Sequence, residues 1–160
     1  MKTKLLMVCL GNICRSPAAE GVMKKVIKNH NASDRYYVDS AGTAGYHEGE
    51  KADSRMRKVG SSRGYTFDSI SRQVRSNDFE KFDYIFAMDN SNYYDLMDDC
   101  PKQHQHKIHK MCEFSKNINA SEVPDPYYGG EKGFHHVIDI LEDACENLFE
   151  QLENGTLASN

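Results

Sequence analysis

The sequence has no tryptophan and only four prolines, and it contains no apolar run that could span a membrane. The apolar stretch after the N-terminus, residues 5–9, is too short for a membrane helix or for the apolar region of a signal peptide. We therefore expect a cytoplasmic protein without a membrane partner. Basic residues are not in excess either, since 20 Lys and Arg stand against 24 Asp and Glu for a net charge of -4. Nucleic-acid-binding surfaces are usually basic, so we expect no nucleic-acid partner.

The length and composition of the chain suit one globular domain. Its 160 residues are enough to bury one core, and 39% hydrophobic and 28% charged residues are ordinary proportions. Because no repeat, low-complexity tract or linker divides the chain, we expect residues 1–160 to form a single domain. The five cysteines are an odd number in a chain without an export signal, so we expect reduced, unpaired thiols.

Strand and helix patterns alternate along the chain. Apolar runs predict buried strands at residues 5–8, 36–40 and 84–88, and a weaker edge strand at residues 107–111. Ser16 and Pro17 are typical of an N-cap and a first helical position. Further helices are predicted over residues 53–63, over residues 89–97 behind a capping Asp89, and over residues 134–152, where apolar side chains recur at helical spacing.

Four strands interleaved with helices predict an α/β fold, namely a doubly wound, four-stranded parallel sheet with helices on both faces. Ligands bind such sheets at the carboxyl ends of the strands. Cys9, Ser40, Asp89 and the neighbourhood of Cys112 follow predicted strands. We therefore expect these residues to meet at one edge of the sheet.

The segment after the first strand has the composition of a phosphate-binding loop. Its backbone N–H groups can form an anion nest, to which the following helix adds the positive end of its dipole. Gly11 and Asn12 tolerate the left-handed backbone angles that such a loop requires. The predicted phosphate-binding residues are Leu10, Gly11, Asn12, Ile13, Cys14, Arg15 and Ser16.

Cys9 and Arg15 frame this loop and could carry chemistry. The guanidinium fork of Arg15 can bind two phosphoryl oxygens, and the same positive field stabilises a nucleophilic thiolate at Cys9. Ser16 can donate a hydrogen bond to that thiolate or simply cap the helix. An ordinary turn with an incidental cysteine is the alternative interpretation.

Attack on a phosphate ester also needs a general acid, and Asp125 is the best candidate. It lies between Pro124 and Pro126, which restrict the backbone, and it is followed by Tyr127 and Tyr128, which could wall a pocket for a flat ring. The residue types alone are equally consistent with a rigid surface turn.

Residues 8–17, with the sequence VCLGNICRSP, resemble the signature of the low-molecular-weight protein-tyrosine phosphatases. The resemblance continues in the family's order over nearly the whole chain, at residues 39–43, 71–73, 82–85, 88–92 and 125–129. It implies that Cys9 forms a phosphocysteine intermediate, that Arg15 holds the phosphoryl oxygens, and that Asp125 acts first as acid and then as base.

The resemblance also implies supporting roles. Tyr46, Tyr127 and Tyr128 would flank the phenyl ring of the substrate. Apart from the resemblance, we expect His47 beside Tyr46 at the pocket mouth. Cys14 would protect Cys9 as a reversible disulfide. The residues implied to support the loop are Asn12, Ser16, Ser40, Arg72 and Asp89.

One position departs from the family pattern. Ser69 stands where the family often carries a histidine that is hydrogen-bonded toward the acid after the third strand. We therefore expect a looser or rebuilt network around Asp89 and Arg72.

Two other enzymes of the same fold remain as alternatives. A protein-arginine phosphatase usually carries threonine where this chain has Ile13, and it would not need the Tyr127–Tyr128 pair. An arsenate reductase needs two further cysteines to relay a disulfide. Cys100 and Cys112 are present but do not resemble that relay pair.

A non-enzymatic alternative comes from the cysteines and histidines that crowd one segment of the chain. Such side chains at short spacing can bind zinc in a regulatory module, although this spacing matches no closed zinc site. The residues concerned are Cys100, His104, His106, His109 and Cys112.

The interpretation that unites these observations is a metal- and cofactor-independent phosphatase. We expect it to act on phosphotyrosine in proteins or peptides and on small aryl phosphates, with inorganic phosphate or other oxyanions as inhibitors. We expect a monomer or weak dimer.

Overall fold

The computed structural model describes residues 1–157, and residues 158–160 of the predicted domain lie outside the described residues. Four strands form one parallel sheet in the order β2-β1-β3-β4. The strands are β1 (Thr3–Cys9), β2 (Tyr36–Gly42), β3 (Tyr84–Ala87) and β4 (Ile108–Lys110). The predicted four-stranded parallel sheet is confirmed, and the weak fourth strand lies at an edge.

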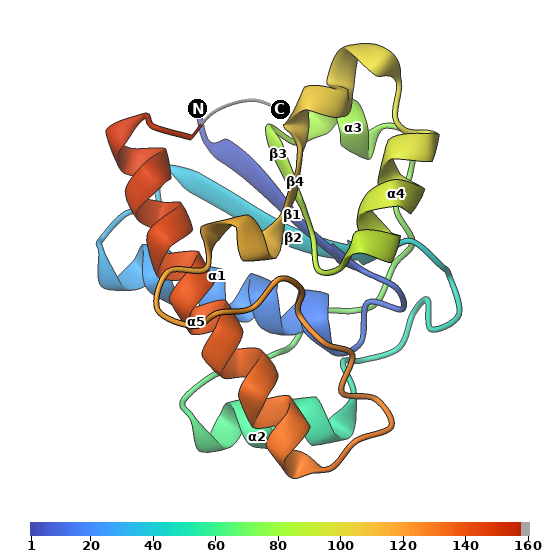
Figure 1. Cartoon of the computed structure of the whole chain (residues 1–160), viewed down its shortest axis with the longest axis vertical. Coiled ribbons are helices and arrows are strands. Elements are labelled where there is room, and N and C mark those ends of the chain that lie inside the picture. The colour runs from blue at the N-terminus through green and yellow to red at the C-terminus, as the bar shows by residue number, and fades with distance from the viewer. Residues whose placement is uncertain (158–160) are drawn as a thin grey trace.

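Helices cover both faces of this sheet (Figure 1). The α-helices are α1 (Arg15–Asn29), α2 (Ser54–Ser62), α3 (Asp78–Lys81), α4 (Asn90–Asp99) and α5 (Glu131–Asn154). Two short 3-10 helices, η1 (Lys102–Lys107) and η2 (Met111–Phe114), flank β4. Helices α1 and α5 pack on one face and α3 and α4 on the other, while α2 packs against α5.

The apolar run of β1 explains why the sheet is covered on both sides. Leu5 and Met7 belong to the core under α1 and α5, whereas Leu6 and Val8 belong to the core under α3 and α4. All four side chains are fully buried. Burying each of them stabilises the fold by about 1.5–3 kcal/mol, so β1 is anchored at the centre of the molecule.

The predicted starts of α2 and α4 agree with the structure to within one residue, whereas the predicted start of α1 does not. Asp53 and Asp89 cap α2 and α4, since their side chains accept hydrogen bonds from the N–H groups of Arg55 and Asn92. The prediction that Ser16 caps α1 is wrong, because the helix already begins at Arg15 and no side chain caps it. Helices α3, η1 and η2 were not predicted. No helix among residues 1–157 is long and apolar enough to cross a bilayer.

Candidate functional site

The candidate site lies where β1 ends at Cys9 and the chain passes into α1. Strands β1 and β3 are neighbours in the sheet, and the connection after β1 runs to β2 on one side, whereas the connection after β3 runs to β4 on the other. Such a switch point opens a crevice at the carboxyl ends of the strands. A cavity of about 290 Å³ occupies it. It is lined by Cys9, Leu10, Gly11, Ile13, Cys14, Arg15, Tyr46, His47, Asp125, Tyr127 and Tyr128.

The carbonyl groups of the loop are held away from the cavity by its surroundings. The oxygens of Cys9 and Leu10 accept hydrogen bonds from the N–H groups of Thr43 and Ala44 at 2.9 and 3.0 Å. The oxygen of Gly11 accepts from the Ser71 hydroxyl at 3.0 Å.

The oxygen of Ile13 is held in the same way by the Asp53 N–H, at 2.7 Å. In a trans peptide unit the N–H points opposite to the carbonyl, and the described chain has no cis peptide bond. The amides that follow these carbonyls, those of Leu10, Gly11, Asn12 and Cys14, therefore point away from the hydrogen-bonding neighbours. This is the arrangement of an anion nest.

Asn12 is the backbone pivot of the loop. Its φ of 56° lies in the left-handed region, as predicted, and its side chain donates to the Ser16 hydroxyl at 2.7 Å. Its Oδ1 accepts from the N–H of Arg72 at 3.0 Å. Gly11 is not left-handed, so that part of the prediction is wrong. Gly11 instead allows close packing, since a Cβ there would lie 3.0 Å from the His47 ring.

Cys9 is only 2% exposed and its Sγ lies 3.1 Å from the Ser16 hydroxyl. That hydroxyl accepts from Asn12 and has one hydrogen of its own, which can go to the Cys9 sulfur or, at 3.3 Å, to the Ala41 carbonyl. Ser16 therefore contacts the sulfur from inside the first turn of α1. The same contact explains why its side chain does not cap the helix.

Arg15 is the buried cation of the site, with 3% of its surface exposed. Its Nη1 donates to Asp89 at 2.6 Å and to the Val123 carbonyl at 3.1 Å, and its Nη2 lies 3.9 Å from Asp125. Burial opposes the charge, but the Cys9 side chain and the Asp89 hydrogen bond outweigh it and raise the pKa of the guanidinium. Arg15 therefore stays charged beside the sulfur.

Cys14, the second thiol of the cavity, differs from Cys9 in its surroundings. Burial, followed by the negative charge of Asp53, raises the pKa of the Cys14 thiol far above its usual range. Cys14 is therefore protonated at neutral pH. The structure thus places a protonated thiol in the same cavity as Cys9.

Asp125 and a group of rings form the mouth of the cavity. The side chain of Asp125 is 47% exposed, and one of its oxygens accepts from the Tyr127 N–H at 3.1 Å. The rings of Tyr127 and Tyr128 meet edge to face with centroids 5.0 Å apart. Tyr46 is 76% exposed on the same rim. The mouth can therefore hold a flat ring beside a carboxylate.

The predicted loop-supporting residues do not act as one network. Asp89 binds Arg15, whereas the Arg72 side chain pairs with Asp39 at 3.1 Å and Asp78 at 2.9 Å. Arg72 reaches the loop only through its backbone N–H to Asn12. The expected network joining Asp89 and Arg72 is therefore rebuilt as two separate ones.

Ser40 also differs from its expected place. Its hydroxyl donates to the buried Glu20 of α1 at 2.6 Å rather than to the loop. Ser69, at the position of the family histidine, is half-buried and lines a small hollow beside Glu20. Three contacts were missed altogether: the Val123 carbonyl on Arg15, the Ser71 hydroxyl on Gly11, and Glu20 beneath Ser40. None has a local sequence signal, because each joins residues that are 20 or more positions apart.

The remaining cysteines lie away from this cavity. Cys100 packs in the core under α3 and α4, while Cys112 packs against the opposite core. Neither lines the Cys9 cavity, so the structure does not bring them to the site as a relay pair. Within residues 1–157, no three His, Cys, Asp or Glu side chains are grouped in a way that could hold a metal ion.

Comparisons with known proteins agree with this geometry. A family model described as low molecular weight phosphotyrosine protein phosphatase matches residues 4–157. The crystal structure of a protein tyrosine phosphatase from Entamoeba histolytica with Hepes in the active site is 70% identical, with a TM-score of 0.97 over 98% of this chain and 100% of that chain. A product state mimic of the Entamoeba histolytica protein is 68% identical, with a TM-score of 0.95 over 99% of this chain and 100% of that one. The low molecular weight phosphotyrosine protein phosphatase of Gallus gallus is 37% identical over 154 residues, 92% of this chain and 94% of its own length.

Proposed function

Because the chain belongs to the low molecular weight phosphotyrosine protein phosphatase family, it is a cysteine-dependent phosphoric monoester hydrolase, and we propose that Cys9, Arg15 and Asp125 carry its reaction. One observation supports this assignment above the others. The Cys9 sulfur, the Arg15 guanidinium and the Asp125 carboxyl line one cavity, and tyrosines form its mouth. Nucleophile, oxyanion-binding cation and proton donor thus surround one reacting centre.

In the first step the Cys9 thiolate attacks phosphorus from the side opposite the phenolic oxygen. A sulfur–phosphorus bond forms while the phosphorus–oxygen bond breaks, and Asp125 gives its proton to the departing phenolate. Tyrosine leaves, and the phosphoryl group remains on Cys9. The hydrogen bond available from Ser16, at 3.1 Å, stabilises the thiolate before attack.

The loop amides and Arg15 stabilise the phosphoryl oxygens during both steps. The amides are fixed by the outward hydrogen bonds of the loop carbonyls, so they need not reorganise as charge develops. Asp89 and Val123 occupy Nη1 of Arg15 and so orient the guanidinium plane. The remaining N–H groups of the fork can then bind two oxygens.

In the second step water hydrolyses the thiophosphate. Asp125, now ionised, takes a proton from the water as its oxygen attacks phosphorus. The sulfur–phosphorus bond breaks, Cys9 returns to the thiolate, and inorganic phosphate is released. The exposure of Asp125 at the cavity mouth gives water access to it.

The mouth favours an aromatic phosphoester of proteins or peptides, and small aryl phosphates that fit the same space. Tyr46, Tyr127 and Tyr128 flank the ring, with His47 at the edge. Inorganic phosphate and other oxyanions should compete for the loop. The Entamoeba histolytica relative holds Hepes, a sulfonate, in its active site, which supports this expectation.

We propose that Cys14, which lines the same cavity as Cys9, protects Cys9 against irreversible oxidation. A peroxide converts the Cys9 thiolate to a sulfenic acid, and the Cys14 sulfur then displaces water to form a Cys9–Cys14 disulfide. A cellular thiol reverses it by exchange. We propose a cytoplasmic location, in which cellular thiols keep cysteines reduced. We propose a monomer or weak dimer that needs no cofactor, metal, membrane or nucleic acid.

A kinetic comparison tests this function. The wild-type enzyme should hydrolyse p-nitrophenyl phosphate and a phosphotyrosine peptide, and a chelator should not change the rate for either substrate. Cys9→Ser should abolish turnover while phosphate still binds. A phosphoarginine peptide should be a poor substrate. Preference for phosphoarginine, or near-native activity of Cys9→Ser, would overturn the proposal.

A further inference from the structure

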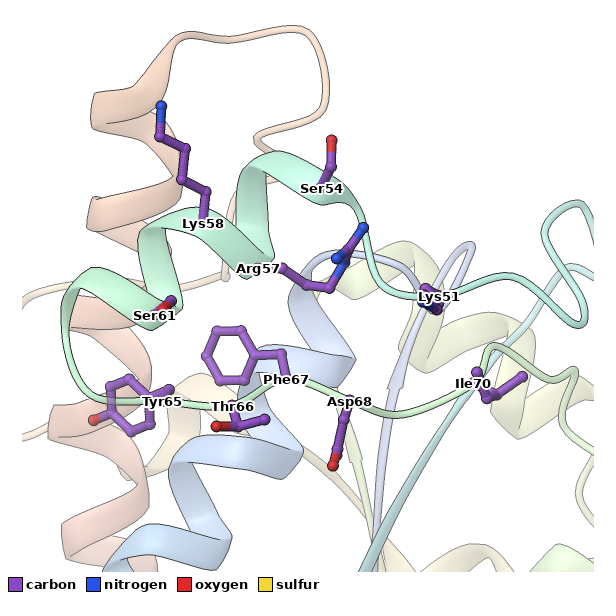
Figure 2. Close-up of a pocket in the computed structure, with 10 residues that line it drawn as sticks. All are labelled: Lys51, Ser54, Arg57, Lys58, Ser61, Tyr65, Thr66, Phe67, Asp68 and Ile70. Carbon is purple, nitrogen blue, oxygen red and sulfur yellow. The ribbon is translucent and has the colours of Figure 1, made fainter.

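A second cavity, of about 490 Å³, lies beneath α2 (Figure 2). We call it the α2 cavity and define it by Lys51, Arg57, Lys58, Tyr65, Phe67 and Ile70. Figure 2 shows the Phe67 ring under the helix, with Lys51 and Ile70 toward one end and Tyr65 at the other. The mechanism described above uses none of these residues.

The floor of the α2 cavity is formed by a buried aromatic ring. Phe67 is 4% exposed and stacks on Tyr65 with ring centroids 5.5 Å apart. The helix can approach this ring because residue 60 is glycine, since a Cβ at Gly60 would collide with Phe67. At the far end, Lys51 and Ile70 form a backbone bridge that fixes the position of both residues. The ring packing and the bridge therefore define the shape of the cavity.

The cations around the α2 cavity are available for a ligand. The neighbouring Arg55 and Arg63 are engaged by Asp53 and by Asp139 and Glu142. By contrast, no carboxylate of residues 1–157 pairs with Lys51, Arg57 or Lys58. Asp68 is the one carboxylate among the described residues that line the cavity. Unpaired cations gathered in a chain of net charge -4 favour an anionic ligand.

A third hollow, of about 460 Å³, adjoins both the α2 cavity and the cavity around Cys9. It shares Ile13, His47 and Tyr127 with the Cys9 cavity, and it shares Lys51, Ser54 and Arg57 with the α2 cavity. Its own carboxylates are already engaged, because Glu50 pairs with His47 and Asp53 with Arg55. The first unpaired charges along this path are therefore Lys51 and Arg57.

We propose that the α2 cavity is a second subsite for the protein substrate, which binds an aspartate or glutamate side chain that flanks the phosphotyrosine. The inference rests on the proposed function, since it requires a phosphotyrosine in the Cys9 cavity. The α2 cavity and the Cys9 cavity share no lining residue, so a small aryl phosphate bound at Cys9 does not occupy the subsite, whereas a peptide can extend to it.

The test compares peptides that carry glutamate or glutamine at one position, scanned over about five residues on either side of phosphotyrosine. For at least one position, the wild-type kcat/KM should be about fivefold higher for the glutamate peptide, mainly through KM. This ratio should fall to about one in the double variant Lys51→Gln/Lys58→Gln. Arg57 is left intact because its Nε supports the Ala52 carbonyl at 2.9 Å.

A matched control separates local contact from overall charge. Lys28→Gln/Lys102→Gln removes the same two charges from exposed positions outside the α2 cavity and should keep the fivefold ratio. Turnover of p-nitrophenyl phosphate should be unchanged in both double variants. A wild-type ratio near one at every position, or an equal fall in both variants, overturns the second subsite. Failure of wild type to hydrolyse any of these substrates would instead overturn the proposed function.

Discussion

Replacing Asp89 with asparagine should show how far catalysis depends on the orientation of Arg15. The two charges lie in a 2.6 Å ion pair with side chains 4% and 21% exposed. At a charge separation of about 4 Å and an effective dielectric constant of about 20, the gross attraction is about 4 kcal/mol. Asparagine still accepts a hydrogen bond from Arg15 and can still cap α4. We therefore expect a net loss of about 2 kcal/mol, or a Tm lower by about 4–8 °C.

The loss of orientation should also appear in the kinetics of Asp89→Asn. We expect kcat to fall about tenfold, equivalent to about 1.4 kcal/mol, while inhibition by phosphate is retained because the loop amides and the charge of Arg15 remain. Asp95→Asn, an exposed acid on the same helix, serves as the control. If Asp89→Asn keeps both the Tm and the kcat of the control, Asp89 does not position Arg15.

Three further substitutions test separate parts of the account. Asp125→Asn should slow hydrolysis of phenyl phosphate about 100-fold and that of p-nitrophenyl phosphate much less, because a good leaving group needs little protonation; equal losses would remove Asp125 from the acid role. Cys14→Ser should keep its activity but recover far less of it than wild type when peroxide treatment is followed by a thiol, whereas equal recovery would argue against the protective disulfide. The hydrogen bond from Arg55 lowers the pKa of the Asp53 carboxyl in the folded protein. Ionised Asp53 therefore stabilises the fold at pH values above the pKa of Asp53 in the unfolded chain, and this stabilisation is lost as the pH falls through the lower pKa of Asp53 in the folded protein. Urea unfolding of Asp53→Asn should therefore show a smaller loss of stability on acidification than wild type, and an identical loss would contradict that linkage.

The parts of the fold that could be predicted are those encoded by contiguous residues. The apolar run of β1, the loop after it and the spacing of apolar residues in α5 all lie in single segments, and their periodicity suffices. Helix α3 has only four residues and β4 only three, so neither carries enough of a pattern to be read with certainty.

The site was predictable in its reacting groups and in the Asn12 and Ser16 contacts within the loop, but not in the distant contacts that hold it. Cys9 and Arg15 share one loop, and Asp125 has a recognisable local sequence. The Ser71 hydroxyl, by contrast, reaches the Gly11 carbonyl across 60 positions, and the Val123 carbonyl reaches Arg15 across 108. These contacts use a common hydroxyl and a backbone oxygen, which have no sequence signature. Of the two roles predicted for Ser16, the contact with Cys9 is confirmed and the helix cap is wrong, because a serine before proline indicates a cap only when no tertiary contact competes for its hydroxyl.

The proposed mechanism requires Cys9 to carry the phosphoryl group between the two steps. Rapid quenching of the reaction with p-nitrophenyl phosphate, followed by mass spectrometry of peptides under conditions that preserve thiophosphate, tests it directly. In the wild-type enzyme we predict one phosphoryl group on the peptide that contains Cys9, and in Cys9→Ser we predict none. Asp125→Asn should accumulate a larger fraction of phosphorylated Cys9 if this substitution slows hydrolysis of the intermediate more than its formation. Turnover without any phosphoryl group on Cys9, or a phosphoryl group on another residue that forms and decays at the rate of turnover, would contradict the account.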